Sequence, residues 1–112
     1  KYLSNVVREF TLKLTDFVWK DYKGESIVWG SDSENRIKSI TLVPSATAAK
    51  YMDLDKTDFK KNTSIKVTLK NSVGVILSPE SEEKSYIEMK VLDAWGITST
   101  VKIPVPIKNE NK

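Results

Sequence analysis

The side chains that most often carry enzyme chemistry are missing from this chain of 112 residues, which has no histidine and no cysteine. This excludes a histidine general base, a cysteine nucleophile, zinc sites of the Cys/His type, haem ligation through histidine and any disulfide. A serine nucleophile would need activation by lysine, and the pair Ser81 and Lys84 lies in a loop rich in helix and strand breakers. We therefore predict no catalytic residue, no cofactor and no enzyme activity.

Carboxylates are the next candidates, because Asp53, Asp55 and Asp58 show the alternation that opens a calcium loop. Such a loop needs glycine at its sixth position and glutamate at its twelfth. Here those positions hold Asp58 and Ser64. We reject an EF-hand and predict no metal site; a solvated acidic turn is the favoured interpretation, with a looser calcium site left open. Nothing marks any two of the fifteen carboxylates as a glycosidase-like pair.

Trp19, Tyr22 and Trp29 form the richest aromatic cluster. A hairpin loop centred on Gly24 would place Trp19 opposite Trp29, whereas a two-residue loop would place it opposite Val28. These aromatic residues could form a platform for sugar rings or for a protein partner. We favour cross-strand packing inside the domain, because the large apolar surface of tryptophan is mostly buried in folded proteins.

Trp95 differs from the other tryptophans because it lies inside a short predicted turn. A side chain in such a turn is expected to be exposed. We predict that Trp95 could anchor a contact with a neighbouring domain.

The charge pattern argues against nucleic acid as a partner. The chain has 18 cationic and 15 anionic residues and a net charge of +3, but only Arg8 and Arg36 are arginines. Nucleic-acid surfaces favour clustered cations and arginine in particular, whereas these lysines are interleaved with carboxylates. No apolar run approaches the length of about 20 residues that spans a membrane. Because the first residue is Lys1, we expect a processed or truncated chain that has lost any targeting segment.

An apolar–polar alternation of period two dominates the chain and predicts half-buried strands. Turn clusters separate these segments, as at residues 21–25 and 78–80. The pattern predicts an all-β fold of about seven strands, a sandwich or a barrel. The strands are expected at residues 9–15, 26–29, 37–43, 65–69, 73–77, 87–91 and 100–107.

The prolines of the last strand restrict where it can lie. Pro104 and Pro106 have the same parity and both lack an N–H donor, so one side of the strand cannot form a ladder there. We therefore expect residues 100–107 to form an edge strand that is paired on one side only. The segment Ser45–Leu54 is ambiguous, and we prefer an irregular strand to one or two helical turns. Residues 1–108 are predicted to form one domain, and residues 109–112 a frayed tail or linker.

Two alternating strands that flank Asp93 and Gly96 resemble the end of immunoglobulin-like domains of the polycystic-kidney-disease and bacterial Ig-like type. In this family a tight Asp-x-x-Gly turn joins the last two strands, and the last strand is rich in Thr and Ser. The resemblance implies an antiparallel immunoglobulin-like β-sandwich. The family usually has a tyrosine eight residues before the aspartate, where this chain has Ser85.

The lysine-rich, cysteine-free composition of the chain also resembles that of modules of Gram-negative bacterial surface lipoproteins. It implies an extracytoplasmic location, in the periplasm or at the cell surface, with a lipid anchor in the full-length protein. We expect a non-catalytic spacer, scaffold or adhesion element whose partners are neighbouring domains or surface proteins. The alternative is a carbohydrate-binding module that uses Trp19, Tyr22 and Trp29 to hold a glycan.

Overall fold

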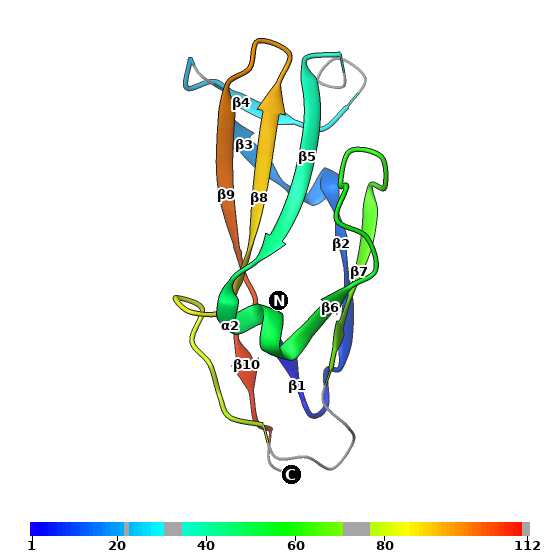
Figure 1. The fold of residues 1–112 in the computed structure, drawn as a ribbon, viewed down its shortest axis with the longest axis vertical. Coiled ribbons are helices and arrows are strands. Elements are labelled where there is room, and N and C mark those ends of the chain that lie inside the picture. The colour runs from blue at the N-terminus through cyan, green and yellow to red at the C-terminus, as the bar shows by residue number, and fades with distance from the viewer. Residues whose placement is uncertain (22, 31–34, 71–76, 111–112) are drawn as a thin grey trace.

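Two three-stranded antiparallel sheets are the largest elements of the computed structural model, which describes residues 1–21, 23–30, 35–70 and 77–110 (Figure 1). One sheet has the strand order β2-β7-β6 and the other β5-β8-β9; a β3–β4 hairpin and a parallel pair, β1 and β10, complete the fold. The elements are β1 Leu3–Ser4, β2 Glu9–Lys13, the 3-10 turn η1 Leu14–Asp16, β3 Val18–Lys20, β4 Ser26–Val28, β5 Ile37–Pro44, α2 Ala46–Tyr51, β6 Met52–Leu54, β7 Ser64–Leu69, β8 Tyr86–Asp93, β9 Thr98–Pro104 and β10 Ile107–Lys108.

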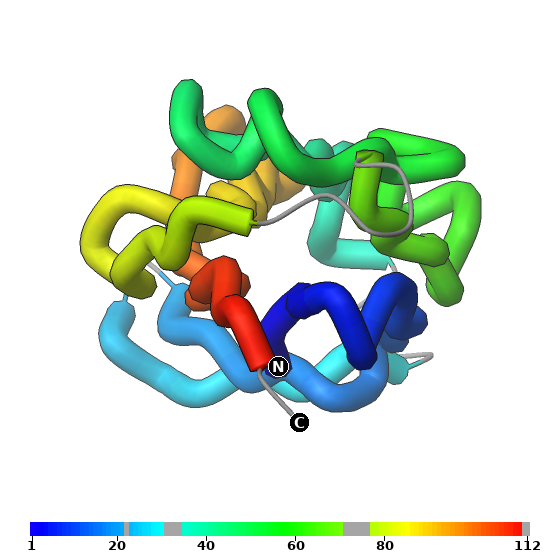
Figure 2. The backbone as a smooth tube through the Cα atoms, turned by 90° about the horizontal axis from the view of Figure 1, so that it is seen from below, coloured from blue at the N-terminus to red at the C-terminus, as the bar shows by residue number. Residues whose placement is uncertain are grey.

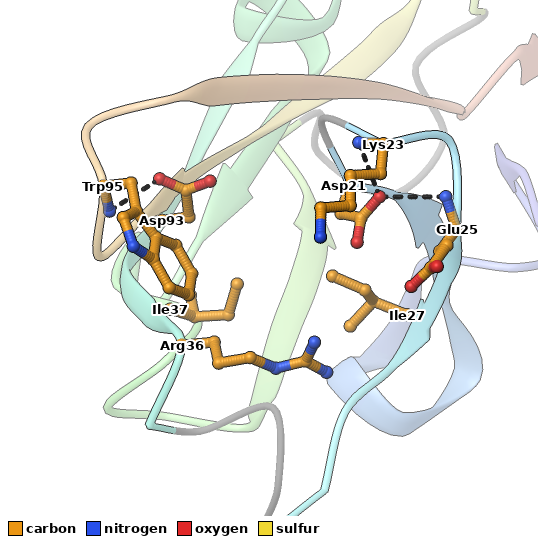
Figure 3. Close-up of a pocket in the computed structure, with 8 residues that line it drawn as sticks. All are labelled: Asp21, Lys23, Glu25, Ile27, Arg36, Ile37, Asp93 and Trp95. Carbon is orange, nitrogen blue, oxygen red and sulfur yellow. Dashed lines mark hydrogen bonds between the residues drawn. The ribbon is translucent and has the colours of Figure 1, made fainter.

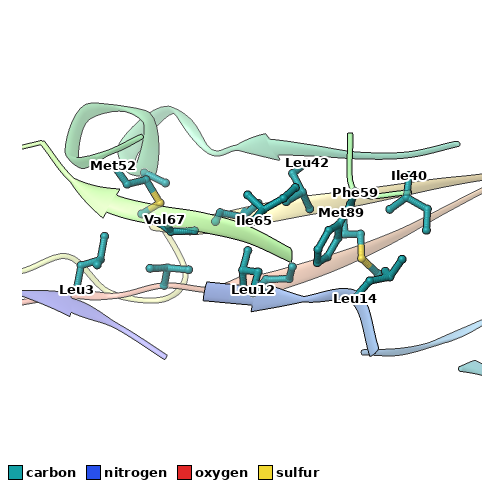
Figure 4. Close-up of a cluster of buried hydrophobic side chains, with 14 of the residues drawn as sticks. Leu3, Leu12, Leu14, Ile40, Leu42, Met52, Phe59, Ile65, Val67 and Met89 are labelled. Carbon is teal, nitrogen blue, oxygen red and sulfur yellow. The ribbon is translucent and has the colours of Figure 1, made fainter. Parts of the chain in front are cut away.

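The predicted alternation is confirmed, and it explains why the sheets form. In β7 every second residue is buried, and the same pattern runs through β8 from Ile87 to Val91. Inward side chains of β2, β5, β7 and β8 belong to one apolar cluster (Figure 4). Phe59 is fully buried in that cluster and makes an edge-on ring contact with Phe17. The chain is all-β as predicted, although the described residues form ten strands, several of them only two or three residues long.

The segment Ser45–Leu54 was expected to be an irregular strand, and this prediction is wrong. It forms the helix α2 and then β6. The Ser45 hydroxyl caps the helix by accepting from the Ala48 amide at 3.1 Å, and the alanines of α2 favour a helix. The same hydroxyl donates to the Lys84 carbonyl at 2.7 Å. One serine thus starts the helix and ties it to the segment that precedes β8.

The last strand lies at a sheet edge, as predicted, but it is interrupted. Among the described residues β9 pairs only with β8. After Pro104 the chain leaves the sheet, and Ile107 of β10 pairs with Leu3 on one side and bridges to Glu80 on the other. The prediction that residues 100–107 pair on one side only is therefore wrong at Ile107. Val105, which lies between the two prolines, still donates its N–H to the Ser85 carbonyl at 3.1 Å. The nitrogens of Pro104 and Pro106 have the opposite parity and therefore face away from β8, so that they offer no N–H donor at the outer edge of the sheet.

The structure also gives the outcome for two further predicted strands and for the turn between the last two strands. The strand expected to reach Thr15 ends at Lys13, and Leu14 is buried from the 3-10 turn instead. Of the strand expected at 73–77, residues 73–76 lie outside the described residues and Leu77 is buried outside any strand. The turn at Asp93 and Gly96 joins β8 to β9 as predicted.

Glu110 is bonded to the beginning of the chain, so the tail expected at 109–112 is wrong as far as Glu110, and residues 111–112 lie outside the described residues. Figure 2 shows the first and the last described segments, β1 and β10, side by side. The carboxylate of Glu110 accepts from the hydroxyls of Tyr2, at 3.1 Å, and of Ser4. Asn5 exchanges two further hydrogen bonds with the Glu110 backbone, both at 2.7 Å. Residues up to Glu110 therefore belong to the folded body.

Removing the helix cap should destabilise the junction between α2 and β8. We expect Ser45→Ala to lower the free energy of unfolding by about 1 kcal/mol, because the Ala48 amide and the Lys84 carbonyl both lose a partner. Ser45→Thr keeps the hydroxyl and should retain most of the stability. Urea unfolding of the three proteins measures this, and equal stabilities of the Ala variant and the parent would contradict it.

The bond between Tyr2 and Glu110 should make stability depend on alkaline pH. The hydrogen bond to Glu110 raises the pKa of Tyr2 above its ordinary 10.0, with burial and the negative charge of Glu110 adding to the effect. A raised pKa stabilises the fold below pH 10.0, and this contribution is lost as the pH rises through the raised value.

We expect the stability difference between the parent and Tyr2→Phe to be constant from pH 8 to 9 and to shrink above pH 10. Both proteins keep Lys66, whose pKa is also raised, by its hydrogen bond and charge interaction with Glu9. Its contribution therefore cancels in the comparison. Urea unfolding at stepped pH measures the difference, and one that grows with pH would refute the assignment.

Candidate functional site

Two turns with the same sequence spacing lie at one end of the elongated molecule, which measures 47 × 23 × 20 Å (Figure 1). The first connects β3 to β4. Asp21 Oδ1 accepts from the amides of Lys23 and Glu25, both at 2.9 Å, and the Gly24 amide donates to the Asp21 carbonyl at 3.0 Å. Gly24 has a φ of 81°, a left-handed conformation that favours glycine.

The second turn, between β8 and β9, repeats this arrangement. Asp93 Oδ1 accepts from the amides of Trp95 at 2.9 Å and Ile97 at 2.8 Å, and the Gly96 amide donates to the Asp93 carbonyl at 3.1 Å. Gly96 has a φ of 88°. In both turns a carboxylate and a glycine hold the backbone, and the described residues Lys23 and Trp95 within them are exposed.

A pocket of about 180 Å³ lies between the two turns (Figure 3). The isoleucines at its floor, Ile27 and Ile37, are 6% and 3% exposed. Its polar groups come from the first turn, from Asp93 and from Arg36, which directly precedes β5. The indole of Trp95 lies on one side of the pocket and the first turn on the other. Both signs of charge and one large aromatic ring thus meet in a small space.

The tryptophans named from the sequence occupy different environments. Trp19 is 4% exposed and belongs to the apolar cluster, whereas Trp95 is 65% exposed. Trp29 is half-buried and packs against the cluster. Tyr22 lies outside the described residues. The structure therefore does not bring Trp19 and Trp29 together on an open surface, while Trp95 is exposed as expected for a side chain in a turn.

Neither expected register of the β3–β4 hairpin is correct. Trp19 pairs with Ile27, not with Trp29 or Val28. The reason is the Asp21 turn, in which the Asp21 amide donates to the Glu25 carbonyl at 2.9 Å and closes the loop there. The hairpin exposes Val18 and Val28 as a cross-strand pair on its outer face, and Trp19 and Ile27 point inward.

The acidic residues near 53–58 do not converge. Asp53 pairs with Lys70 at 3.6 Å, Asp55 Oδ1 accepts from the Lys66 amide at 2.8 Å, and Asp58 Oδ1 accepts from the Lys61 amide at 2.9 Å. Within the described ranges no group of three acidic side chains could hold a metal ion. These carboxylates bond to separate strands and turns.

The sequence interpretation missed Asp21, Glu25 and Arg36 as members of a site. The repeated spacing from Asp21 to Gly24 and from Asp93 to Gly96 is a signal that could have indicated two similar turns. It does not indicate that the turns lie at the same end of the fold. The position of Arg36 beside them depends on where β5 begins, which only the tertiary arrangement sets.

Comparisons with protein-family models, with curated proteins and with solved structures find no match to this chain. In the described part of the chain, no helix combines the length and the apolar character needed to cross a membrane. The site is therefore interpreted from its own geometry.

Substitution of Trp19 and of Trp95 should change the free energy of unfolding by different amounts, because one ring is in the core and the other lines the pocket. We expect Trp19→Ala to lower the free energy of unfolding by about 3–5 kcal/mol, because it leaves a cavity in the apolar cluster. Trp95→Ala should change it by less than about 0.5 kcal/mol, as is usual for exposed positions. Urea unfolding followed by circular dichroism measures both values. Equal losses would contradict the different burial of the two rings.

Proposed function

We propose that the chain is a non-catalytic immunoglobulin-like module of a secreted or surface-anchored bacterial protein, in which it acts as a spacer, scaffold or adhesion element. The observation that carries the proposal is the strand order. Immunoglobulin-like sandwiches have one sheet with strands A, B, E and D and another with C, F and G. The strand order of this chain can be matched to that pattern. Strands β2, β7 and β6 then correspond to B, E and D, and strands β5, β8 and β9 correspond to C, F and G.

Two features depart from the family's simplest form. The β3–β4 hairpin is an insertion between the strands that correspond to B and C. The first strand, β1, pairs in parallel with β10 rather than with β2. Ser85, which stands where the family usually has a tyrosine, is fully buried and donates to the Val105 carbonyl at 2.6 Å. This bond joins the residue before β8 to the last segment, unlike a tyrosine corner, in which the hydroxyl bonds to backbone a few residues upstream.

The mechanism is rigid presentation of turns at one end of the body. Short hairpin turns held by Asp21 and Asp93 leave little freedom to the side chains that they expose. The exposed ring of Trp95 supports an adhesion role over a purely passive spacer, since a spacer has no need of an exposed indole. The expected partners are neighbouring domains or surface proteins, in an extracytoplasmic setting with a lipid anchor on the full-length protein.

The alternative function, a glycan held by Trp19, Tyr22 and Trp29, receives less support. A sugar-binding platform needs open ring faces, and Trp19 is 4% exposed. That set of residues therefore does not carry the function that we favour.

Surface exposure of the module tests the proposal. Antibodies raised against the purified domain should label intact cells of the source organism, and mild protease treatment of those cells should remove the label. An antibody against a cytoplasmic protein provides the control for cell integrity. Labelling that requires lysis and partitions with cytoplasmic proteins would refute an extracytoplasmic module.

A further inference from the structure

The pocket between the two Asp-x-x-Gly turns combines three features that suit a small ligand. It has an apolar floor, one exposed aromatic wall and charged groups of both signs on its rim. We propose that this pocket binds a single pyranose ring of a glycan, stacked against Trp95. The inference rests on the proposed adhesion role and names the class of ligand that would serve it.

The aromatic wall is well suited to a sugar face. Trp95 is 65% exposed, and its backbone is fixed because its amide donates to Asp93 Oδ1 at 2.9 Å. The negative face of an indole attracts weakly positive hydrogen atoms, and a pyranose presents such C–H groups on its flat side. In Figure 3 the ring of Trp95 lies along the pocket with its edge toward Ile37. A flat ligand could therefore pack on Trp95 without disturbing the apolar cluster below.

The polar rim favours a neutral ligand with hydroxyl groups over an ion. Asp21, Glu25 and Asp93 contribute three carboxylates, while Lys23 and Arg36 contribute two cations. A cationic ligand would meet the two cations and an anionic one would meet the carboxylates, whereas a hydroxyl both donates and accepts. A polyol can thus use both kinds of group at once.

Two of these carboxylates are already oriented for such a role. Asp21 and Asp93 each use Oδ1 to accept from two backbone amides. This fixes the direction of the second oxygen, Oδ2, so that a ligand need not pay the entropy of ordering the side chain. In Figure 3 the Arg36 side chain extends across the pocket toward Ile27, where its guanidinium can donate to a ring hydroxyl.

The size of the pocket limits the ligand to one ring. A volume of about 180 Å³ is below the roughly 300–1,000 Å³ of pockets for drug-sized molecules. For a ligand of this size we expect a dissociation constant of about 1 mM. Useful adhesion would then come from many copies of the module or of the sugar on facing surfaces.

The test is a titration followed by NMR, in which each tryptophan indole N–H gives its own signal. The probes are methyl α- and β-pyranosides of glucose, galactose, mannose and N-acetylglucosamine, each added to about 20 mM, above the expected dissociation constant. We expect at least one probe to shift the Trp95 signal in a saturable way while the signal of the buried Trp19 stays unchanged. Trp95→Ala should abolish the saturable shifts of backbone amides in the two turns.

Two further variants make the assignment specific. Arg36→Gln should weaken binding about tenfold, because a charged donor is replaced by a neutral one. Ile97→Ala serves as the matched control: Ile97 is 44% exposed in the same turn and does not line the pocket. It should leave the affinity unchanged.

Three outcomes would overturn the inference. The first is no saturable shift with any pyranoside, and the second is binding that survives Trp95→Ala. The third is saturation by arginine methyl ester or by acetate but by no sugar, which would assign the pocket to a charged side chain of a protein partner. In each case labelling of intact cells by antibodies still tests the proposed module by itself, so the two failures remain distinguishable.

Discussion

Burial of apolar side chains in one shared cluster is the constraint on which the rest of this structure depends. The chain has no cysteine for a disulfide, and the described residues hold no metal-binding group. Its two three-stranded sheets are therefore held together by side chains such as Leu12, Leu42, Ile65 and Met89, all 1% exposed or less. Because such burial is the main favourable term in folding, the alternation that produces it also determines which strands can pair and in which register.

The position of the two Asp-x-x-Gly turns at one end of the molecule follows from the packing of the strands around this cluster. Strands β3, β4, β8 and β9 carry their inward residues into the cluster, and their connecting turns therefore project beyond it. Asp21 and Asp93 then satisfy the turn amides locally, so these turns need no packing of their own. Side chains in the turns are released from the core and can take part in recognition. The apolar cluster that stabilises the fold and the turns available for binding therefore lie at different places along the long axis of the molecule.

Much of the fold could be predicted from the sequence, because an alternating strand carries its own pattern. The buried faces of β7 and β8 and the turn at Asp93 are confirmed. The helix α2 was missed, since three alanines in a short segment do not separate helix from strand until Ser45 is seen to cap the first turn. The continuation of the last strand was missed because the pairing of Ile107 with Leu3 joins opposite ends of the chain.

The candidate site was harder to predict for a related reason. Trp19 and Trp95 both stand beside a turn of the same form, yet one points into the cluster and the other does not. The difference is positional: Trp19 lies within a strand, two residues before the turn aspartate, whereas Trp95 lies two residues after it and inside the turn itself. A strand residue at that parity shares the buried face with Ile27, while Trp95 lies in the turn beyond the end of β8 and is 65% exposed. Exposure of Trp95 is therefore a direct consequence of the turn, and the charged residues around it come from segments that only the folded chain brings together.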